Sequence, residues 1–192
     1  QEKINQNPHF VYLAYFAPGV IKVGISQEER GIRRLLEQGA RLALKLETFS
    51  SALIARQYEA KIARLDGVVE TMPVHKKLEL IKQPFERADG EKKLQQKLLE
   101  IEQKIGVSFL RSELIPCEDY FHTTGVDLTR VVLMKDQNQL AGRVRSIIGP
   151  ILIADYDGQL LAYNLKKFIG YQAQKINGAI DIEIPSTQLA LF

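Results

Sequence analysis

The stretch from position 10 to position 59 constrains the fold most strongly, because its pattern prescribes strand, strand, helix, strand and helix in that order. Residues 10–16 and 20–26 are rich in aromatic and β-branched side chains, and Pro18 and Gly19 lie between them, which predicts a β-hairpin. Apolar residues in the second run alternate with polar or small ones. One face of this strand is therefore apolar, and the other is free for chemistry.

An arginine-rich helix follows the hairpin. Ser26 is predicted to cap its start, and Gly39 is predicted to end it. Residues 42–49 form an apolar run that predicts a third strand, and Ser50 or Ser51 then opens a second helix.

The second helix carries two neighbouring rows of side chains. The row predicted to face the core is apolar and consists of Ile54, Tyr58, Ile62 and Leu65. The other row consists of small residues and one carboxylate, namely Ala52, Ala55, Glu59 and Ala63. A glutamate among alanines can approach another element closely, as a ligand in a cleft would. The residues alone leave a second interpretation open, in which Glu59 is solvated beside Arg56 or Lys61.

The order of elements and several short motifs resemble the GIY-YIG nuclease superfamily. Phe10-Val11-Tyr12 stands at the position of the GIY motif, and Lys22-Val23-Gly24 stands at the position of YIG. The pattern is more closely similar to an offshoot of that superfamily known only as a domain of unknown function. The chain departs from the superfamily at Phe10, which replaces a glycine, and at Lys22, which replaces a tyrosine.

The resemblance implies a site for phosphodiester hydrolysis. Arg34 would hold the scissile phosphate, and Glu59 would bind one divalent ion, Mg²⁺ or Mn²⁺. Tyr12 would orient or deprotonate the attacking water, and Lys22 would hold phosphate or act as a base. Further candidates for contact with the substrate are Ser26, Arg30 and Arg33. From the residues alone, a strand tyrosine that packs on its neighbour is the better interpretation of Tyr12.

The chain as a whole is predicted to be α+β, with a GIY-YIG-like sheet domain, a connecting helix and a small antiparallel β-barrel. The expected units are a nuclease-like domain at 1–82, a helical connector at 83–108, a barrel at 109–184 and a flexible tail at 185–192. The connector contains a loop over residues 83–90, with Pro84, and a helix over residues 91–105.

The barrel is predicted from short strand-like runs separated by turn residues. These runs are residues 126–134, 139–148, 151–155, 160–164, 168–171 and 180–184. A basic aromatic surface for nucleic acid is one interpretation of Arg143, Arg145, Lys166, Lys167, Tyr163 and Tyr171. Ordinary exposed strand faces with core aromatics are the other.

The last residues resemble the pentapeptide with which bacterial repair proteins dock on the DNA sliding clamp. The residues that would bind the clamp are Gln188, Leu189, Leu191 and Phe192. A flexible tail suits such docking. The alternative is a final edge strand that covers its own core.

Charge and composition set looser bounds on function. A net charge of +3 permits nucleic-acid binding without arguing for it, and the single cysteine, Cys117, excludes a disulfide framework within the chain. We find no run long and apolar enough for a membrane span and no signal peptide, so we expect a cytoplasmic protein with no membrane partner.

Three functions compete at this point. The first is a metal-dependent DNA endonuclease of the repair or recombination type, tethered to the sliding clamp by its tail, with RNA as an alternative substrate. The second is a catalytically inactive nucleic-acid-binding protein of the same fold, which would be consistent with Lys22 at the tyrosine position. The third is an adaptor that works through the clamp-binding tail.

Overall fold

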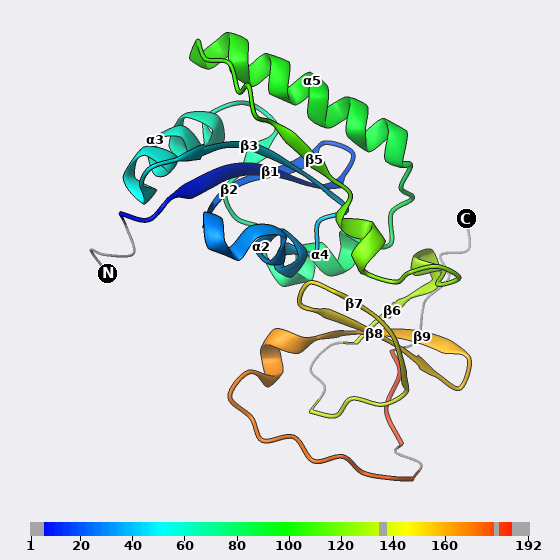
Figure 1. The fold of residues 1–192 in the computed structure, drawn as a ribbon. Coiled ribbons are helices and arrows are strands. Elements are labelled where there is room, and N and C mark those ends of the chain that lie inside the picture. The colour runs from blue at the N-terminus through cyan, green and yellow to red at the C-terminus, as the bar shows by residue number, and fades with distance from the viewer. Residues whose placement is uncertain (1–5, 135–137, 179–180, 186–192) are drawn as a thin grey trace.

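The computed structural model describes residues 6–134, 138–178 and 181–185, which form two sheets and several helices (Figure 1). The α+β class predicted from the sequence is confirmed. No helix in these ranges is long and apolar enough to cross a membrane.

The first sheet has five strands in the order β4-β2-β1-β3-β5. Its strands are β1 (His9–Ala17), β2 (Val20–Gln27), β3 (Leu42–Phe49), β4 (Val68–Val69) and β5 (Glu113–Ile115). β1 pairs antiparallel with both β2 and β3, which confirms the predicted hairpin and third strand. β4 pairs in parallel with β2, and β5 pairs antiparallel with β3. Every residue of the central strand β1 is buried, so both faces of the sheet are covered.

Each face of the first sheet packs against a different set of helices. The helices are α2 (Gly31–Gln38), α3 (Ala52–Ala63), α4 (Val74–Leu80) and α5 (Arg87–Ile105), with short 3₁₀ turns η1 (Glu28–Arg30), η2 (Cys117–Tyr120), η3 (Leu128–Arg130) and η4 (Leu165–Phe168). Even-numbered residues of β1 form one core cluster with α2, α4 and the second sheet. Odd-numbered residues form the other cluster with α3 and α5. The two-residue period of a strand thus separates two cores.

The helix ends follow the local sequence in most places. Gly39 ends α2 with φ of 71°, as predicted, and Ser51 caps α3 by accepting a hydrogen bond from the Ile54 backbone N–H. The predicted cap at Ser26 is wrong. Ser26 belongs to β2, and η1 is inserted before α2, so the helix begins only at Gly31.

Two other helix predictions need correction. Ile54 is 36% exposed and does not join the core, whereas Ile62 is buried and Tyr58 and Leu65 pack against the same core cluster, as predicted. Ala52 and Ala55 of the small-residue row are buried as well, so α3 turns both rows toward the sheet. Small side chains let the helix lie close to β2. The connector helix starts at Arg87, inside the stretch predicted as a loop, and α5 packs on the first sheet through Leu94 and Leu98.

The second sheet is an open sheet in the described part of the chain and not the predicted closed barrel. Its strands are β6 (Val132–Leu133), β7 (Arg143–Ile148), β8 (Ile151–Tyr156) and β9 (Gln159–Asn164), in the order β6-β9-β8-β7. β6 pairs in parallel with β9, so an all-antiparallel arrangement is also wrong. Residues 168–171 form no strand, because Asn164 caps η4 there and Gly170 follows with φ of 87°. No strand occurs in residues 181–185 either.

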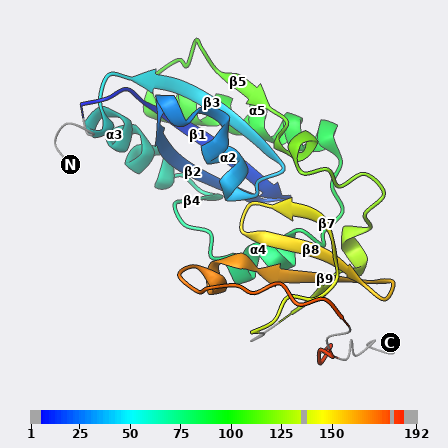
Figure 2. The ribbon, with the colours of Figure 1, turned by 60° about the horizontal axis from the view of Figure 1, so that its bottom comes forward.

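The second sheet lies on the side of the first sheet that carries α2 and α4 (Figure 2). Ile148, Ile151 and Ile153 belong to the same core cluster as the even-numbered residues of β1. At the point of closest approach, a Cβ on Gly149 would lie 2.6 Å from the backbone nitrogen of Gly39. The β7–β8 turn therefore touches the end of α2 backbone to backbone. The boundaries between the sequence-predicted units stay a prediction.

Candidate functional site

The candidate site is built around Gly24, at the centre of β2. The register of the hairpin places Tyr12 directly opposite Gly24. A Cβ on Gly24 would lie 2.6 Å from both Cζ and Oη of Tyr12 and 3.1 Å from Nζ of Lys22. The missing side chain therefore makes room for a phenol and an ammonium group over one point of the strand.

Tyr12 supplies a buried hydroxyl that lacks a hydrogen-bond partner. The side chain is 0% exposed, and within the described residues no group is in hydrogen-bonding geometry with Oη, although the Arg34 guanidinium lies near enough to lower the pKa of the phenol as a hydrogen-bond donor. Burial raises the pKa of Tyr12, and the positive charge of Arg34 opposes this rise. A buried polar atom without a partner costs about 1–3 kcal/mol, so this hydroxyl is suited to binding a water or ligand oxygen.

Lys22 is a buried cation beside this hydroxyl. It is 8% exposed, its Nζ donates to the carbonyl oxygen of Val23 at 2.9 Å, and Nζ lies 5.8 Å from the centre of the Tyr12 ring. Burial lowers the pKa of Lys22, and the negative charge of Glu59 opposes that shift. The lysine is thus coupled to both the phenol and the carboxylate.

Glu59 reaches the site from α3. Burial raises the pKa of this carboxyl, Lys22 lowers it, and nearby Glu70 raises it again. Glu70 follows β4, whose Val69 pairs with Lys22, and the sequence contains no signal that this short strand would pair there. The described residues contain no group of three His, Cys, Asp or Glu side chains that could hold a metal ion. Two carboxylates nevertheless fit Mg²⁺, which proteins bind through one or two carboxylates while several waters remain.

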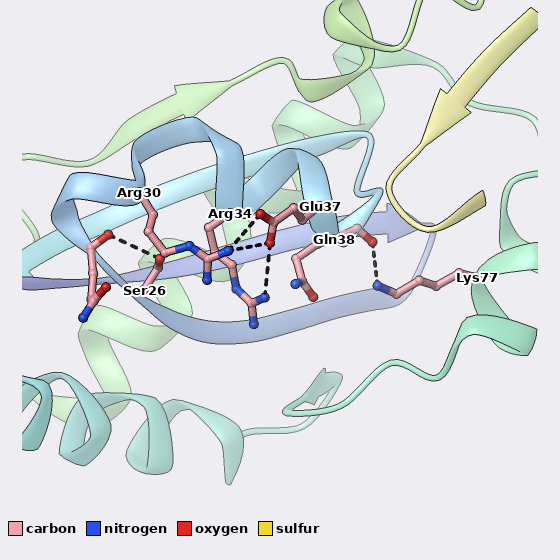
Figure 3. Close-up of polar contacts among 7 residues, drawn as sticks. Ser26, Arg30, Arg34, Glu37, Gln38 and Lys77 are labelled. Atoms are coloured by element: carbon pink, nitrogen blue, oxygen red, sulfur yellow. Dashed lines mark hydrogen bonds and ion pairs between the residues drawn. The ribbon is translucent and has the colours of Figure 1, made fainter. Parts of the chain in front are cut away.

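The helix α2 presents a row of polar side chains at intervals of one turn. Arg34 and Gln38 are four residues apart and therefore lie on one side of the helix. Arg30 precedes the helix at the end of η1 and reaches the same side through its contact with Glu37. Figure 3 shows both arginines reaching toward the carboxylate of Glu37. The Arg30 guanidinium lies 2.6 Å from that carboxylate and the Arg34 guanidinium 3.7 Å. Because these pairs are partly exposed, they are weak and exchangeable.

The remaining substrate candidates on the first sheet and α2 divide into two groups. Ser26 is buried on β2, two residues beyond Gly24 on the same face of the strand, and its Oγ donates to the Gln27 carbonyl at 3.3 Å. Arg33 is exposed and lies off the row formed by Arg30 and Arg34. The structure therefore brings Ser26 and Arg30 near the site and leaves Arg33 on another side of α2.

A second lysine, Lys77, joins this site without any signal in the sequence. It is 5% exposed, and its Nζ donates to the carbonyl oxygen of Gln38 at 2.6 Å (Figure 3). Burial, together with repulsion from Lys166, Lys22 and Arg34, lowers the pKa of Lys77 to about 8. Lys77 follows another lysine, Lys76, on the short helix α4, so nothing in the local sequence distinguishes it and only the fold reveals its position.

Two predictions concern the remainder of the chain. The basic aromatic surface is wrong in one respect, because Tyr163 is buried and its hydroxyl donates to the Ala141 carbonyl at 3.1 Å. Tyr171 is exposed. The candidate clamp-binding residues Gln188, Leu189, Leu191 and Phe192 lie outside the described residues.

Comparison with known proteins gives one match. The profile of the family described as "Protein of unknown function (DUF2797)" matches residues 1–173. No curated protein and no solved structure matches the chain. The match agrees with the resemblance to a domain of unknown function, whereas kinship with the GIY-YIG superfamily and the clamp-binding motif stay predictions. Since the match covers most of its length, the chain belongs to the DUF2797 family.

Proposed function

We propose that this protein hydrolyses phosphodiester bonds in DNA in a metal-dependent reaction, as an endonuclease of the GIY-YIG type. The observation that supports this proposal most strongly is the grouping of Tyr12, Lys22, Arg34 and Glu59 around Gly24. Tyr12 and Lys22 meet over the glycine, and each of these two is coupled electrostatically to Arg34 and to Glu59. A phenol, two cations and a carboxylate can supply the water-orienting group, the charge stabilisation and the metal ligand that hydrolysis of a phosphodiester uses.

Each side chain has a distinct role in the proposed reaction. The planar guanidinium of Arg34 binds two oxygens of the scissile phosphate after leaving its loose contact with Glu37. The unpartnered hydroxyl of Tyr12 accepts a hydrogen bond from the attacking water and orients it. Since burial raises its pKa, the phenol is protonated at neutral pH and keeps its own proton while it accepts this hydrogen bond. Lys22 balances the negative charge that accumulates on the phosphate.

Glu59, with Glu70 close to it, would hold the divalent ion, Mg²⁺ or Mn²⁺. When bound, such an ion would supply charge stabilisation and a more acidic bound water. The half-buried position of Glu59 suits this role, because a carboxylate that is partly removed from water is stabilised when it binds a cation.

A cleavage assay tests the proposal directly. Supercoiled plasmid and labelled branched, single-stranded and RNA substrates would be incubated with the protein in Mg²⁺, Mn²⁺ or EDTA. We expect cleavage that requires the metal and that falls at least about a hundredfold in Glu59→Gln and Arg34→Gln, while Arg111→Gln, an exposed arginine far along the chain, cleaves normally. Failure of the folded wild-type protein to cut any of these substrates would reject the nuclease.

A non-catalytic nucleic-acid-binding protein is the second candidate. It is favoured by Lys22, whose ammonium group occupies the place of a second phenol and is held by the Val23 carbonyl. This candidate predicts binding that weakens with salt and is indifferent to metal and to Glu59→Gln. Binding without cleavage would select it over the enzyme.

We also propose that the tail tethers the protein to the sliding clamp through Gln188, Leu189, Leu191 and Phe192. Removal of residues 188–192 should abolish co-elution with a bacterial sliding clamp on a sizing column, because a short linear motif of this kind makes the whole interface. Co-elution that persists after the deletion would reject the tether.

A further inference from the structure

Lys77 is a buried cation without a matching negative charge. Its ammonium group contacts the Gln38 carbonyl at 2.6 Å and lies 5.2 Å from the centre of the Phe16 ring, and neither partner carries a full charge. The ion pairs observed within the described residues do not include Lys77. Buried charges in proteins are normally paired, so an uncompensated one indicates a place for an anion.

The charged groups that surround Lys77 make the imbalance larger. Lys166, Lys22 and Arg34 all repel its charge and lower its pKa. They belong to three separate elements, since Lys22 is on β2, Arg34 is on α2 and Lys166 is on η4 at the end of the second sheet. Cations from both sheets therefore lie near enough to Lys77 to act on its charge.

A purely structural role explains only part of this arrangement. A lysine at the last carbonyls of α2 would interact favourably with the helix end. Arg41 has that role for α4, where its guanidinium donates to the carbonyls of Leu80 and Ile81. The two sites differ in their surrounding charges. Arg41 has the negative charge of Glu118 nearby, which opposes the lowering of its pKa by burial. The charged groups that shift the pKa of Lys77 are all positive.

We propose that Lys77 and Lys166 form a second anion-binding position, next to the one at Arg34, which takes a neighbouring phosphate of the same nucleic-acid strand. This assignment rests on the proposed function for the identity of the ligand as a phosphodiester strand. Four residues of α2 span about 6 Å, so Arg34 and the end of the helix at Gln38 form a line of polar groups that leads to Lys77. Arg30 lies before this line, at the end of η1. The strand lies along α2 and reaches the second sheet at Lys166.

This geometry determines which ligands bind well. A strand that carries consecutive phosphates contacts both positions, whereas a mononucleotide or free phosphate contacts one. Lys166 is exposed and can follow the ligand, while Lys77 is fixed by the Gln38 carbonyl. The second sheet thus takes part in binding the substrate.

The test measures the salt dependence of binding, in EDTA so that no cleavage occurs. Fluorescence anisotropy of labelled single-stranded DNA and RNA gives the slope of log K against log salt. The slope should become shallower by about 0.7 for each phosphate contact removed from a single strand. We expect this change in Lys166→Gln and in Lys77→Gln, and none in Lys92→Gln, an exposed lysine on α5 across the first sheet.

Three outcomes separate this inference from the proposed function. A shallower slope in Lys166→Gln, which is exposed and should fold normally, supports the second position even if Lys77→Gln fails to fold. A wild-type slope in Lys166→Gln beside a shallower slope in Arg34→Gln overturns the second position and leaves the proposed function standing. Shallower slopes in both lysine variants, from a protein that cuts nothing with Mg²⁺, support the second position while the nuclease is rejected.

Discussion

Replacing Gly24 with alanine tests the geometry of the site most directly. The substitution adds one methyl group 2.6 Å from Cζ and Oη of Tyr12, closer than nonbonded atoms approach. The backbone offers no other objection, because Gly24 is not among the glycines with positive φ. At such a position alanine normally stabilises a protein by about 0.4–1 kcal/mol, since it restricts the unfolded chain. The close contact with the Tyr12 ring should instead make Gly24→Ala destabilising.

The magnitude follows from the packing around Tyr12. The ring is fully buried in a strand that is covered on both faces, so it cannot turn away without displacing its neighbours. Overpacking of a core costs about 1–3 kcal/mol. After the gain from the unfolded chain is subtracted, Gly24→Ala should destabilise by about 1–2 kcal/mol.

A double-mutant cycle assigns this cost to the ring. Tyr12→Leu removes Cζ and Oη but keeps an apolar side chain, so Gly24→Ala in that background should be neutral or slightly stabilising. Urea unfolding followed by circular dichroism would give a coupling free energy of about 2 kcal/mol between the two positions. An equal effect of Gly24→Ala in both backgrounds, to within about 0.5 kcal/mol, would refute the arrangement of Tyr12 over Gly24.

Three further predictions concern the charges and hydroxyls of the site. Tyr12→Phe should leave the free energy of unfolding in urea unchanged or raise it by about 1 kcal/mol, because it removes a buried hydroxyl without a partner. The matched control Tyr163→Phe should lower that free energy by about 1 kcal/mol, because it removes a hydroxyl that is hydrogen-bonded. A lower stability of Tyr12→Phe would show that the Tyr12 hydroxyl is bonded. The free energy of unfolding of the wild type, relative to that of Lys77→Met, should rise by about 2 kcal/mol from about pH 7 to pH 10. Lys77 loses its proton near pH 8 in the folded state but only above pH 10 in the unfolded state, so the unfolded state binds more protons in this window. Parallel pH profiles of the two proteins would contradict the low pKa. Glu37→Gln should tighten binding of a labelled single strand about twofold or more in anisotropy, because it frees two arginines for phosphate, and unchanged affinity would mean that the carboxylate does not compete.

Local patterns were sufficient to predict most of the first sheet. The hairpin, the third strand and the helix end at Gly39 depend on neighbouring residues, namely alternation along a strand and a glycine with positive φ. The apolar row of α3 is predicted correctly except at Ile54, which is 36% exposed, and the neighbouring row of small residues faces the sheet as well. Here Ala52 and Ala55 face the sheet, since a close approach to β2 requires small residues.

Features that depend on distant residues could not be predicted. The parallel pairing of β6 with β9 joins runs on opposite sides of the β7–β8 hairpin, and no turn residue specifies it. Glu70 and Lys77 lie near the site only because β4 and α4 pack beside β2 and α2, respectively. Within the site, Tyr12, Lys22, Arg34 and Glu59 were predicted through a resemblance, and their coupling in the structure is consistent with that choice.

The contact between Gly39 and Gly149 has a consequence for how the two sheets can evolve or be engineered. Since main-chain atoms meet there, with a Cβ at Gly149 falling 2.6 Å from Gly39, no side-chain adjustment can absorb an insertion at this point. The position of the β7–β8 turn against the end of α2 is consequently set by contact between main-chain atoms. An engineered protein in which another module replaces the second sheet would need to keep this pair of glycines. Without them, the new module would lie at a different distance from α2 and would not be aligned with the first sheet.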